Sequence, residues 1–206
     1  MSTLRLVAVT AGLSRPSSTR LLTDRLTDSA KRLLAERGVS AEVETVELRD
    51  LAVDIATAMT TGFPVGRLRA ALDAVARADG LIAVTPVFTA SYSGLFKSFF
   101  DILDKNALTG TPVVIAATGG TSRHSLALEH ALRPLFAYLR ALVLPTAVYA
   151  ASEDWGNTDG LVHRIDRAAR ELANQISGDR GPERATADEF EDVTPFEERL
   201  AGLYGR

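Results

Sequence analysis

The chain has 206 residues, of which 46% are apolar and 24% are charged, and its formal net charge is −3. This length suits one domain with a tail, and the near-neutral charge argues against a general nucleic-acid surface, which needs clustered Lys and Arg. The absence of cysteine excludes disulfides, thiolate catalysis, Fe–S clusters and cysteine-type zinc sites. The apolar run at the N-terminus is too short for a signal sequence and no stretch of about 18 apolar residues could span a bilayer, so we expect a soluble, cytoplasmic protein.

Short apolar, β-rich runs alternate with longer helical patterns along the chain. The predicted strands are Leu4–Thr10, Ala41–Glu47, Gly80–Thr85, Pro112–Ala117 and Leu144–Tyr149. The predicted helices are Ser18–Glu36, Arg67–Arg77, Gly94–Leu103, Ser125–Leu142 and Gly160–Ile176. Four of the strands are nearly continuous hydrophobic runs, which is typical of a parallel sheet that helices cover on both faces. The pattern therefore predicts one doubly wound α/β domain over residues 1–177.

Residues 178–206 are predicted to form an acidic C-terminal tail. Residues 177–206 hold eight acidic residues and four arginines, which leaves the body of the chain with a charge of about +1. Residues 178–192 have the composition of a linker, and a short helix is possible at Pro195–Tyr204.

Open α/β sheets bind ligands outside the carboxyl ends of their strands, so the loops after the first, third and fourth strands are the candidate sites. The first loop, residues 11–19, carries four hydroxyl groups and one arginine between a strand and a helix start: Ser14, Arg15, Ser17, Ser18 and Thr19. Helix N-termini bind phosphate through free N–H groups, and hydroxyls and arginine add further donors. The alternative, that Ser17 or Ser18 only caps the helix, explains one of the four hydroxyls.

The other two loops are also unusual in composition. Residues 85–94 combine successive backbone amides with aromatic and small side chains, which suits a flat heterocycle, although aromatics after a strand are often only core. Residues 117–124 contain Gly119 and Gly120, which let backbone approach a ligand closely, and Arg123, which could meet a phosphate. A tight strand-to-helix turn would equally explain a lone glycine pair.

In conjunction, the three loops resemble those of the NADPH-dependent FMN reductase family. The segments TPVFTASYSGLFKSFFDIL and ALTGTPVVIAATGGTSRHSLALEHALRPLF are similar to the reductases of two-component flavin systems, such as those of alkanesulfonate and methanesulfonate monooxygenases. The likeness covers roughly residues 4–176, is weak in 48–66 and is absent in the tail. It implies a flavodoxin-like, five-stranded parallel sheet with the strand order 2-1-3-4-5.

The resemblance also assigns roles to the three loops. It implies that the FMN phosphate is held by Ser14, Arg15, Ser17, Ser18 and Thr19. It implies that the isoalloxazine and ribityl groups are lined by Pro86, Val87, Phe88, Thr89, Ala90 and Ser91. The pyrimidine side of the ring would meet Thr118, Gly119, Gly120 and Thr121. Hydride would pass from NADPH or NADH to FMN, and reduced FMN would leave for a partner monooxygenase. Because the cofactors carry this chemistry, no catalytic side chain and no metal ligand are assigned.

Two other functions remain open at this point. One is an enzyme of the same fold that keeps FMN tightly bound and reduces quinones or azo dyes. The other is a flavodoxin-type electron carrier or redox sensor with no enzymatic activity. A response-regulator receiver is disfavoured because Thr10 and Thr85 stand where its acidic residues would be. Lys97 and Asp101 match a pair in the family's third helix, yet their spacing also fits a simple surface pair.

The segments around 94–103 and 125–142 are apolar on nearly every side, which predicts that a partner covers their second face. The resemblance supplies a homodimer or homotetramer through these helices. Pro134 removes the N–H that the His130 carbonyl would accept, so we predict a π-turn closed by the N–H of Leu135. A simple proline kink is the alternative. By resemblance, His130 would face the subunit interface near the flavin and affect its release.

Overall fold

The computed structural model of the protein describes residues 3–156 and 159–178. The predicted tail, its linker from residue 179 onward and the possible helix Pro195–Tyr204 lie outside these residues. Among the residues described, every helix is too short or too polar to span a lipid bilayer.

The strands are β1 (Leu4–Thr10), β2 (Ala41–Glu47), β3 (Gly80–Phe88), β4 (Ser91–Tyr92), β5 (Pro112–Gly119), β6 (Leu142–Val143) and β7 (Val148–Ala151). The α-helices are α1 (Ser18–Glu36), α2 (Ala52–Thr61), α3 (Gly66–Ala76), α4 (Gly94–Ile102), α5 (Arg133–Tyr138) and α6 (Asp159–Ser177). Short 3₁₀ turns occupy η1 (Leu48–Leu51), η2 (Ser122–His124) and η4 (Ser152–Trp155), and η3 (Leu128–Leu132) is a π-helix.

The strands form a twisted sheet in the order β2-β1-β3-β5-β6, with parallel pairing between neighbours. β7 also pairs with β5 in parallel, and β4 pairs with β3 in an antiparallel hairpin. The α/β class and the parallel sheet are therefore confirmed, but the expected count of five strands is wrong, because the sheet has seven strands within the described residues. The predicted last strand, Leu144–Tyr149, overlaps only the start of β7, and β6 lies just before it. Pro145 separates the two strands, since its nitrogen has no hydrogen to donate to the sheet. The third strand runs on past Thr85 into the hairpin with β4.

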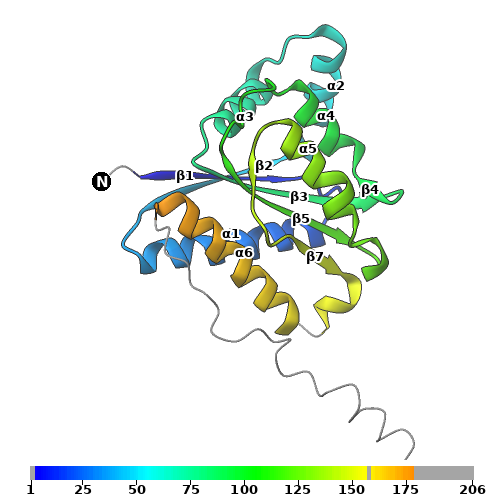
Figure 1. Ribbon diagram of the computed structural model, residues 1–206. Helices are drawn as coiled ribbons and strands as arrows, with labels where there is room; N and C mark the ends of the chain where they lie inside the picture. Colours follow the sequence, from blue (N-terminus) through cyan, green and yellow to red (C-terminus); the bar gives the residue numbers. More distant parts are fainter. Residues whose placement is uncertain (1–2, 157–158, 179–206) are drawn as a thin grey trace, which may run out of the picture.

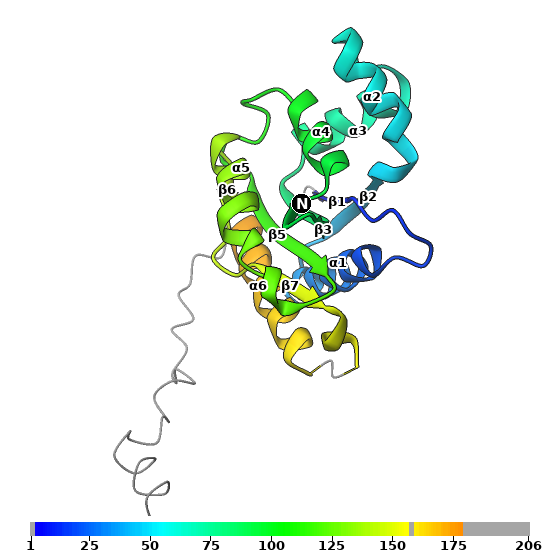
Figure 2. The ribbon, with the colours of Figure 1, turned by 90° about the vertical axis from the view of Figure 1, so that its right-hand side faces the viewer.

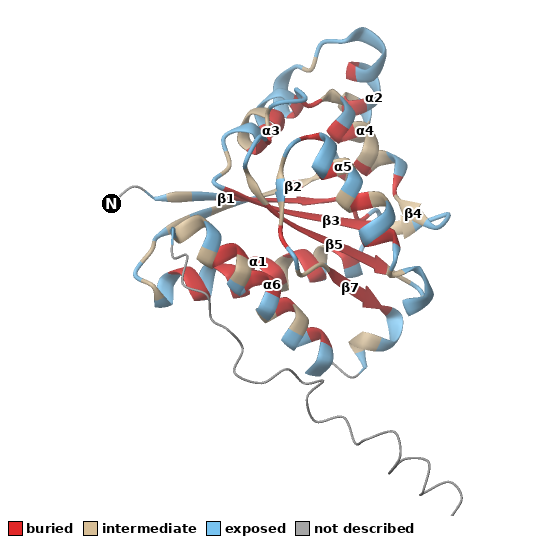
Figure 3. Ribbon diagram, viewed as in Figure 1, coloured by how far each residue is buried: buried red, intermediate tan, exposed pale blue. Residues whose placement is uncertain are grey.

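Helices cover the sheet on both faces, as the long apolar strands require (Figure 1). α1 and α6 pack on one face, around a core that includes Leu22, Leu26 and Leu172. α2, α3, α4 and α5 lie over the other face, where a cluster of aromatic side chains forms the centre of the core: Phe96, Phe99, Phe100 and Phe136. Figure 3 shows the central strands as an almost continuous buried layer between these two sets of helices. The sheet thus provides a rigid platform for the loops at its edge.

Several helices match their predicted bounds, and α1 does so at both ends. Sequence reasoning missed η1 and α2, which lie in the segment of weak resemblance. Their buried residues Leu48, Leu51, Ile55 and Ala58 recur at spacings of three and four, so an amphipathic pattern was present in the sequence.

The predicted helix over 125–142 is not a single regular helix. It is the π-helix Leu128–Leu132 followed by the short α5, and the chain then turns at Arg140, whose φ of 59° is left-handed. The widened turn is thus present around His130, but its i→i+5 bond joins the Arg133 N–H to the Leu128 carbonyl, two residues earlier than predicted. Pro134 lies in the first turn of α5, directly after the π-helix, and has no N–H to donate to a carbonyl of the preceding turn.

Candidate active site

The carboxyl ends of β1, β3 and β5 lie side by side, so the three loops that follow them gather at one edge of the sheet. Figure 2 looks onto this edge. Direct pairings fix the arrangement: Thr10 lies opposite Val84 in β3, and Pro86 lies opposite Thr118 in β5. The parallel order of the strands therefore brings together the loops that the sequence had singled out.

The first loop, residues 11–19, enters α1 through Ser17. The Ser17 side chain accepts a hydrogen bond from the Arg20 N–H at 3.2 Å, so Ser17 is the N-cap of α1. Gly12 lies directly against this cap, because a Cβ on Gly12 would come within 2.1 Å of Ser17 Oγ. The capping interpretation is therefore correct for Ser17, and it leaves the other hydroxyls of the loop without that explanation.

The first loop also offers a set of unused donors. In the part of the chain that the structure describes, seven of its backbone N–H groups make no hydrogen bond to protein: those of Gly12, Leu13, Ser14, Arg15, Ser17, Ser18 and Thr19. Thr10, at the end of β1, is buried, and its Oγ1 atom also lacks a hydrogen-bond partner there. N–H groups at a helix start bind anions, and a buried atom such as Thr10 Oγ1 normally has a partner, so this loop fits a polar, anionic ligand such as the FMN phosphate.

A buried hydrogen bond joins the first loop to the third. Thr19 Oγ1 and Thr118 Oγ1 lie 2.8 Å apart, although 99 residues separate them in the sequence. Both side chains are almost fully buried. The predicted phosphate loop and the predicted pyrimidine loop are thus parts of one site.

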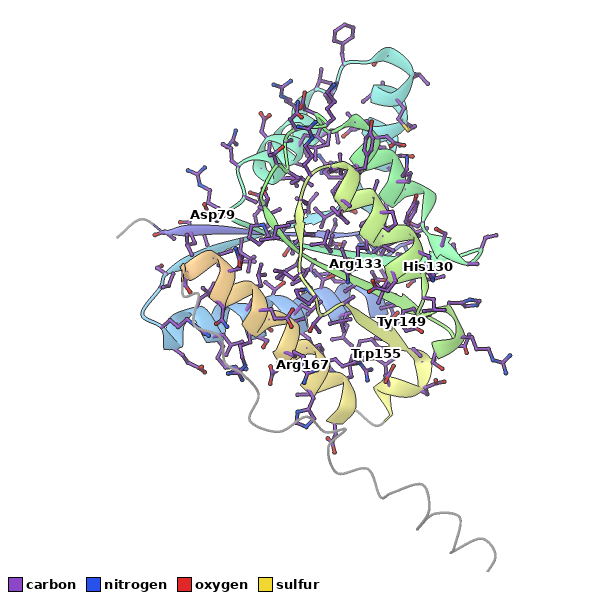
Figure 4. All side chains as sticks on the ribbon, in the orientation of Figure 1. Asp79, His130, Arg133, Tyr149, Trp155 and Arg167 are labelled. Carbon is purple, nitrogen blue, oxygen red and sulfur yellow. The ribbon has the colours of Figure 1, made fainter. Side chains whose placement is uncertain are left out.

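The central part of the third loop, residues 118–121, packs against and is hydrogen-bonded to Tyr149 on β7, which Figure 4 labels. The Tyr149 hydroxyl donates to the Thr121 carbonyl at 2.9 Å. The ring lies so close to Gly119 that an added Cβ would approach the hydroxyl oxygen to 2.1 Å and Cζ to 3.1 Å. Burial, with a smaller effect of Glu153 and Asp154, raises the pKa of the Tyr149 hydroxyl above its usual value, which keeps it protonated as a donor. The Gly120 N–H and the Thr121 N–H make no hydrogen bond within the described residues and so remain available to a ligand.

The second loop is a tight hairpin between β3 and β4. Thr89 and Ala90 form its turn with φ values of 48° and 66°, as in a type I′ turn. Ser93 follows as the N-cap of α4, and its N–H donates to Thr85 Oγ1 at 3.0 Å. Phe88 is 47% exposed at the hairpin, while Pro86 lies within the sheet. This loop therefore presents backbone and an exposed aromatic ring beside the third loop.

Sequence reasoning missed the residues that support the first loop from outside. Arg49, in η1, donates to the Ser14 carbonyl at 2.9 Å and to Glu47 at 2.7 Å. Asp50 lies 3.5 Å from Arg15, and Arg20 donates to Glu47. The sequence signal for this support was the charged pair Arg49 and Asp50 close after the second strand. That strand ends at the same edge of the sheet as the first loop. No comparable signal in the sequence pointed to Tyr149, because an aromatic residue is common in a strand.

The two helices expected to need a partner are largely buried within the chain itself. Of their apolar residues, eight are buried against the protein's own core: Phe96, Phe99, Phe100, Leu103, Leu128, Leu132, Phe136 and Leu139. Most of the second face of these helices is therefore covered within the chain, by α2 and the aromatic cluster, and the expected partner subunit stays a prediction. What remains exposed is Leu126, Tyr138 and Leu142. A groove of about 640 Å³ also lies between α4 and the segment 130–139, lined in part by His130, Pro134 and Lys97. Lys97 pairs with Asp101 at 2.5 Å across this rim.

Comparison of the sequence with known proteins finds similarity to flavin reductases. A family model described as NADPH-dependent FMN reductase matches residues 4–156. An FMN reductase (NADPH) of Pseudomonas aeruginosa is 40% identical over 183 residues, covering 86% of this chain and 95% of the relative. The NADH-dependent FMN reductase SfnF of Pseudomonas fluorescens is also 40% identical, covering 82% of this chain and 90% of the relative.

Solved structures give the same result. An oxidoreductase of Corynebacterium diphtheriae has a TM-score of 0.84 at 49% identity, covering 86% of this chain and 99% of that one. The apo form of the NADH:FMN oxidoreductase EmoB has a TM-score of 0.72 at 28% identity, covering 83% and 89%. The flavodoxin-like fold and the oxidoreductase class expected from the sequence are confirmed. The chain belongs to the NADPH-dependent FMN reductase family.

Proposed function

We propose that this protein transfers hydride from NADPH or NADH to FMN and supplies the reduced flavin to a partner monooxygenase. The observation that carries the proposal is the paired set of unbonded N–H groups on the first and third loops, which the buried Thr19–Thr118 bond joins at one edge of the sheet. This arrangement suits a ligand with an anionic phosphate at one end and hydrogen-bonding ring atoms at the other. The names of the relatives support FMN as that ligand.

Each loop has a distinct task in this proposal. The N–H groups and hydroxyls of Ser14, Ser18 and Thr19, with Arg15, bind the phosphate, while Ser17 mainly holds the helix start. Residues Pro86 to Ser91 line the ribityl group and the ring. The N–H groups of Gly120 and Thr121 orient the pyrimidine side. FMN, when bound, supplies the hydride acceptor, so the protein's part is to bind, orient and exclude water.

The same proposal includes a homodimer or homotetramer formed through the rim of the α4 groove. Tyr138, which lines the groove, is 74% exposed, and Leu126 is 62% exposed. His130 on η3 and Pro134 in α5 lie between them in the sequence. Covering these side chains would place His130 at the interface, near the third loop. Light scattering at micromolar concentration tests this assembly, and a monomer would refute it.

The activity is tested by anaerobic oxidation of NADPH and NADH with added FMN, FAD and riboflavin. We expect turnover with free FMN as the acceptor. Flavin that copurifies with the protein and turnover only with quinones or azo dyes would favour the tightly bound alternative. A stable blue semiquinone with little NAD(P)H oxidation would favour an electron carrier instead.

A further inference from the structure

Arg49 holds the first loop at a single backbone atom. Its guanidinium, 21% exposed, donates one N–H to the Ser14 carbonyl at 2.9 Å and another to Glu47 at 2.7 Å. Glu47 is in turn held by Arg20 on α1. The fork of the guanidinium therefore links the end of β2 to the loop with little freedom to rotate.

The bond to Ser14 also fixes the direction of the next N–H. In a trans peptide the carbonyl of one residue and the N–H of the following residue point in opposite directions. Arg49 follows β2, the edge strand of the sheet, and holds the Ser14 carbonyl outward on that side, so the Arg15 N–H points away from this edge. This N–H makes no hydrogen bond in the described part of the chain.

Arg49 does not act as a free positive charge. Arg49 and its two neighbouring cations, Arg15 and Arg20, form ion pairs with three carboxylates, those of Asp24, Glu47 and Asp50. With its charge balanced by these partners, Arg49 contributes mainly through geometry.

We propose that Arg49 is a positioning residue for the phosphate of the flavin: by holding the Ser14 carbonyl outward, it aims the Arg15 N–H at that phosphate. The inference rests on the proposed function, in which the first loop binds FMN. Because riboflavin has the same ring without the phosphate, the role of Arg49 concerns FMN and not riboflavin.

The test compares the dissociation constants of FMN and riboflavin, measured by quenching of flavin fluorescence, in the wild type and in Arg49→Gln. We expect FMN affinity to fall about tenfold and riboflavin affinity to change less than twofold, since one hydrogen bond to a charged phosphate is lost or misdirected. Arg49→Lys keeps the charge but not the fork, so we expect an intermediate loss for FMN alone. If Arg49→Gln does not fold, Arg49→Lys tests the inference in its place.

Arg37→Gln is the matched control. Arg37 likewise donates to a backbone carbonyl, that of Leu33 at 2.7 Å, but at the far end of α1. We expect it to leave both affinities unchanged. Unaltered FMN affinity in the Arg49 variants, or an equal loss for both flavins, would overturn the inference. Equal affinity of the wild type for FMN and riboflavin would instead refute the phosphate role of the whole loop, and with it the proposed site.

Discussion

The first and third loops of the site are held in place by different kinds of interaction. The first loop lies at the surface, and the ion pairs of Arg15, Arg20 and Arg49 support it from the side of β2. The third loop is held by neutral hydrogen bonds, a buried one between Thr19 and Thr118 and a part-buried one from Tyr149 to Thr121. Exposed ion pairs are weak and screened by salt, whereas buried neutral bonds and close packing are not. The first loop is therefore the more adjustable of the two at its exposed ion pairs, and the third loop is the rigid one.

The largest effect is expected for Gly119→Ala in the rigid loop. The new Cβ would lie 2.1 Å from the Tyr149 hydroxyl oxygen and 3.1 Å from Cζ, and Tyr149 is a buried side chain that would have to shift. We expect overpacking to lower the free energy of unfolding by about 3 kcal/mol, measured by urea denaturation.

Gly120→Ala is the control for this change, because its Cβ would meet no atom within 4 Å. It should alter stability by less than about 0.5 kcal/mol. Adding Tyr149→Phe to Gly119→Ala should recover part of the loss, since the closest atom is removed. An equal loss of stability for both glycine variants would argue against close packing of Tyr149 on Gly119.

Removing the bond between the two loops should have the next largest effect. Thr19→Val leaves Thr118 Oγ1 buried without its partner, so we expect a loss of about 1–2 kcal/mol in the free energy of unfolding. The double variant Thr19→Val with Thr118→Val should cost less than the sum of the single changes. Additive costs would mean that the two hydroxyls do not interact.

Alkaline pH should expose the contribution of Tyr149. Burial raises the pKa of its hydroxyl above the ordinary value of 10.0, with Glu153 and Asp154 adding to the effect. The stabilisation is therefore complete below about pH 10 and is lost as the pH rises through the folded-state pKa, by at most about 1.4 kcal/mol per pH unit. Unfolding curves at pH 8 and above pH 10 should diverge more for the wild type than for Tyr149→Phe. Parallel curves would contradict this role.

The smallest effect is expected at the adjustable loop. The hydrogen bond that Arg20 donates to Asp24 is the main reason that the pKa of Arg20 is raised, but both side chains are more than a third exposed. Asp24→Asn should therefore cost only about 0.3–0.5 kcal/mol, and this cost should vanish in 1 M salt. The cost of Thr19→Val, in contrast, should not depend on salt. A salt-resistant loss in Asp24→Asn would erase the distinction between the two loops.

The sequence alone determined the features that depend on neighbouring residues. Apolar runs set β1 and β2 at their observed bounds, hydroxyl and glycine content indicated the loops that carry the site, and Pro134 predicted the widened helix around His130. Each of these follows from backbone chemistry or from a local pattern.

Only the tertiary structure decided which distant side chains meet. Thr19 with Thr118, Arg49 with Ser14, and Tyr149 with Thr121 lie 99, 35 and 28 residues apart. The packing of one chain also buried most of the apolar helix faces that local patterning had assigned to a second subunit. A local pattern states that a side chain needs cover or a partner, but the identity of that partner depends on how the strands and helices pack together.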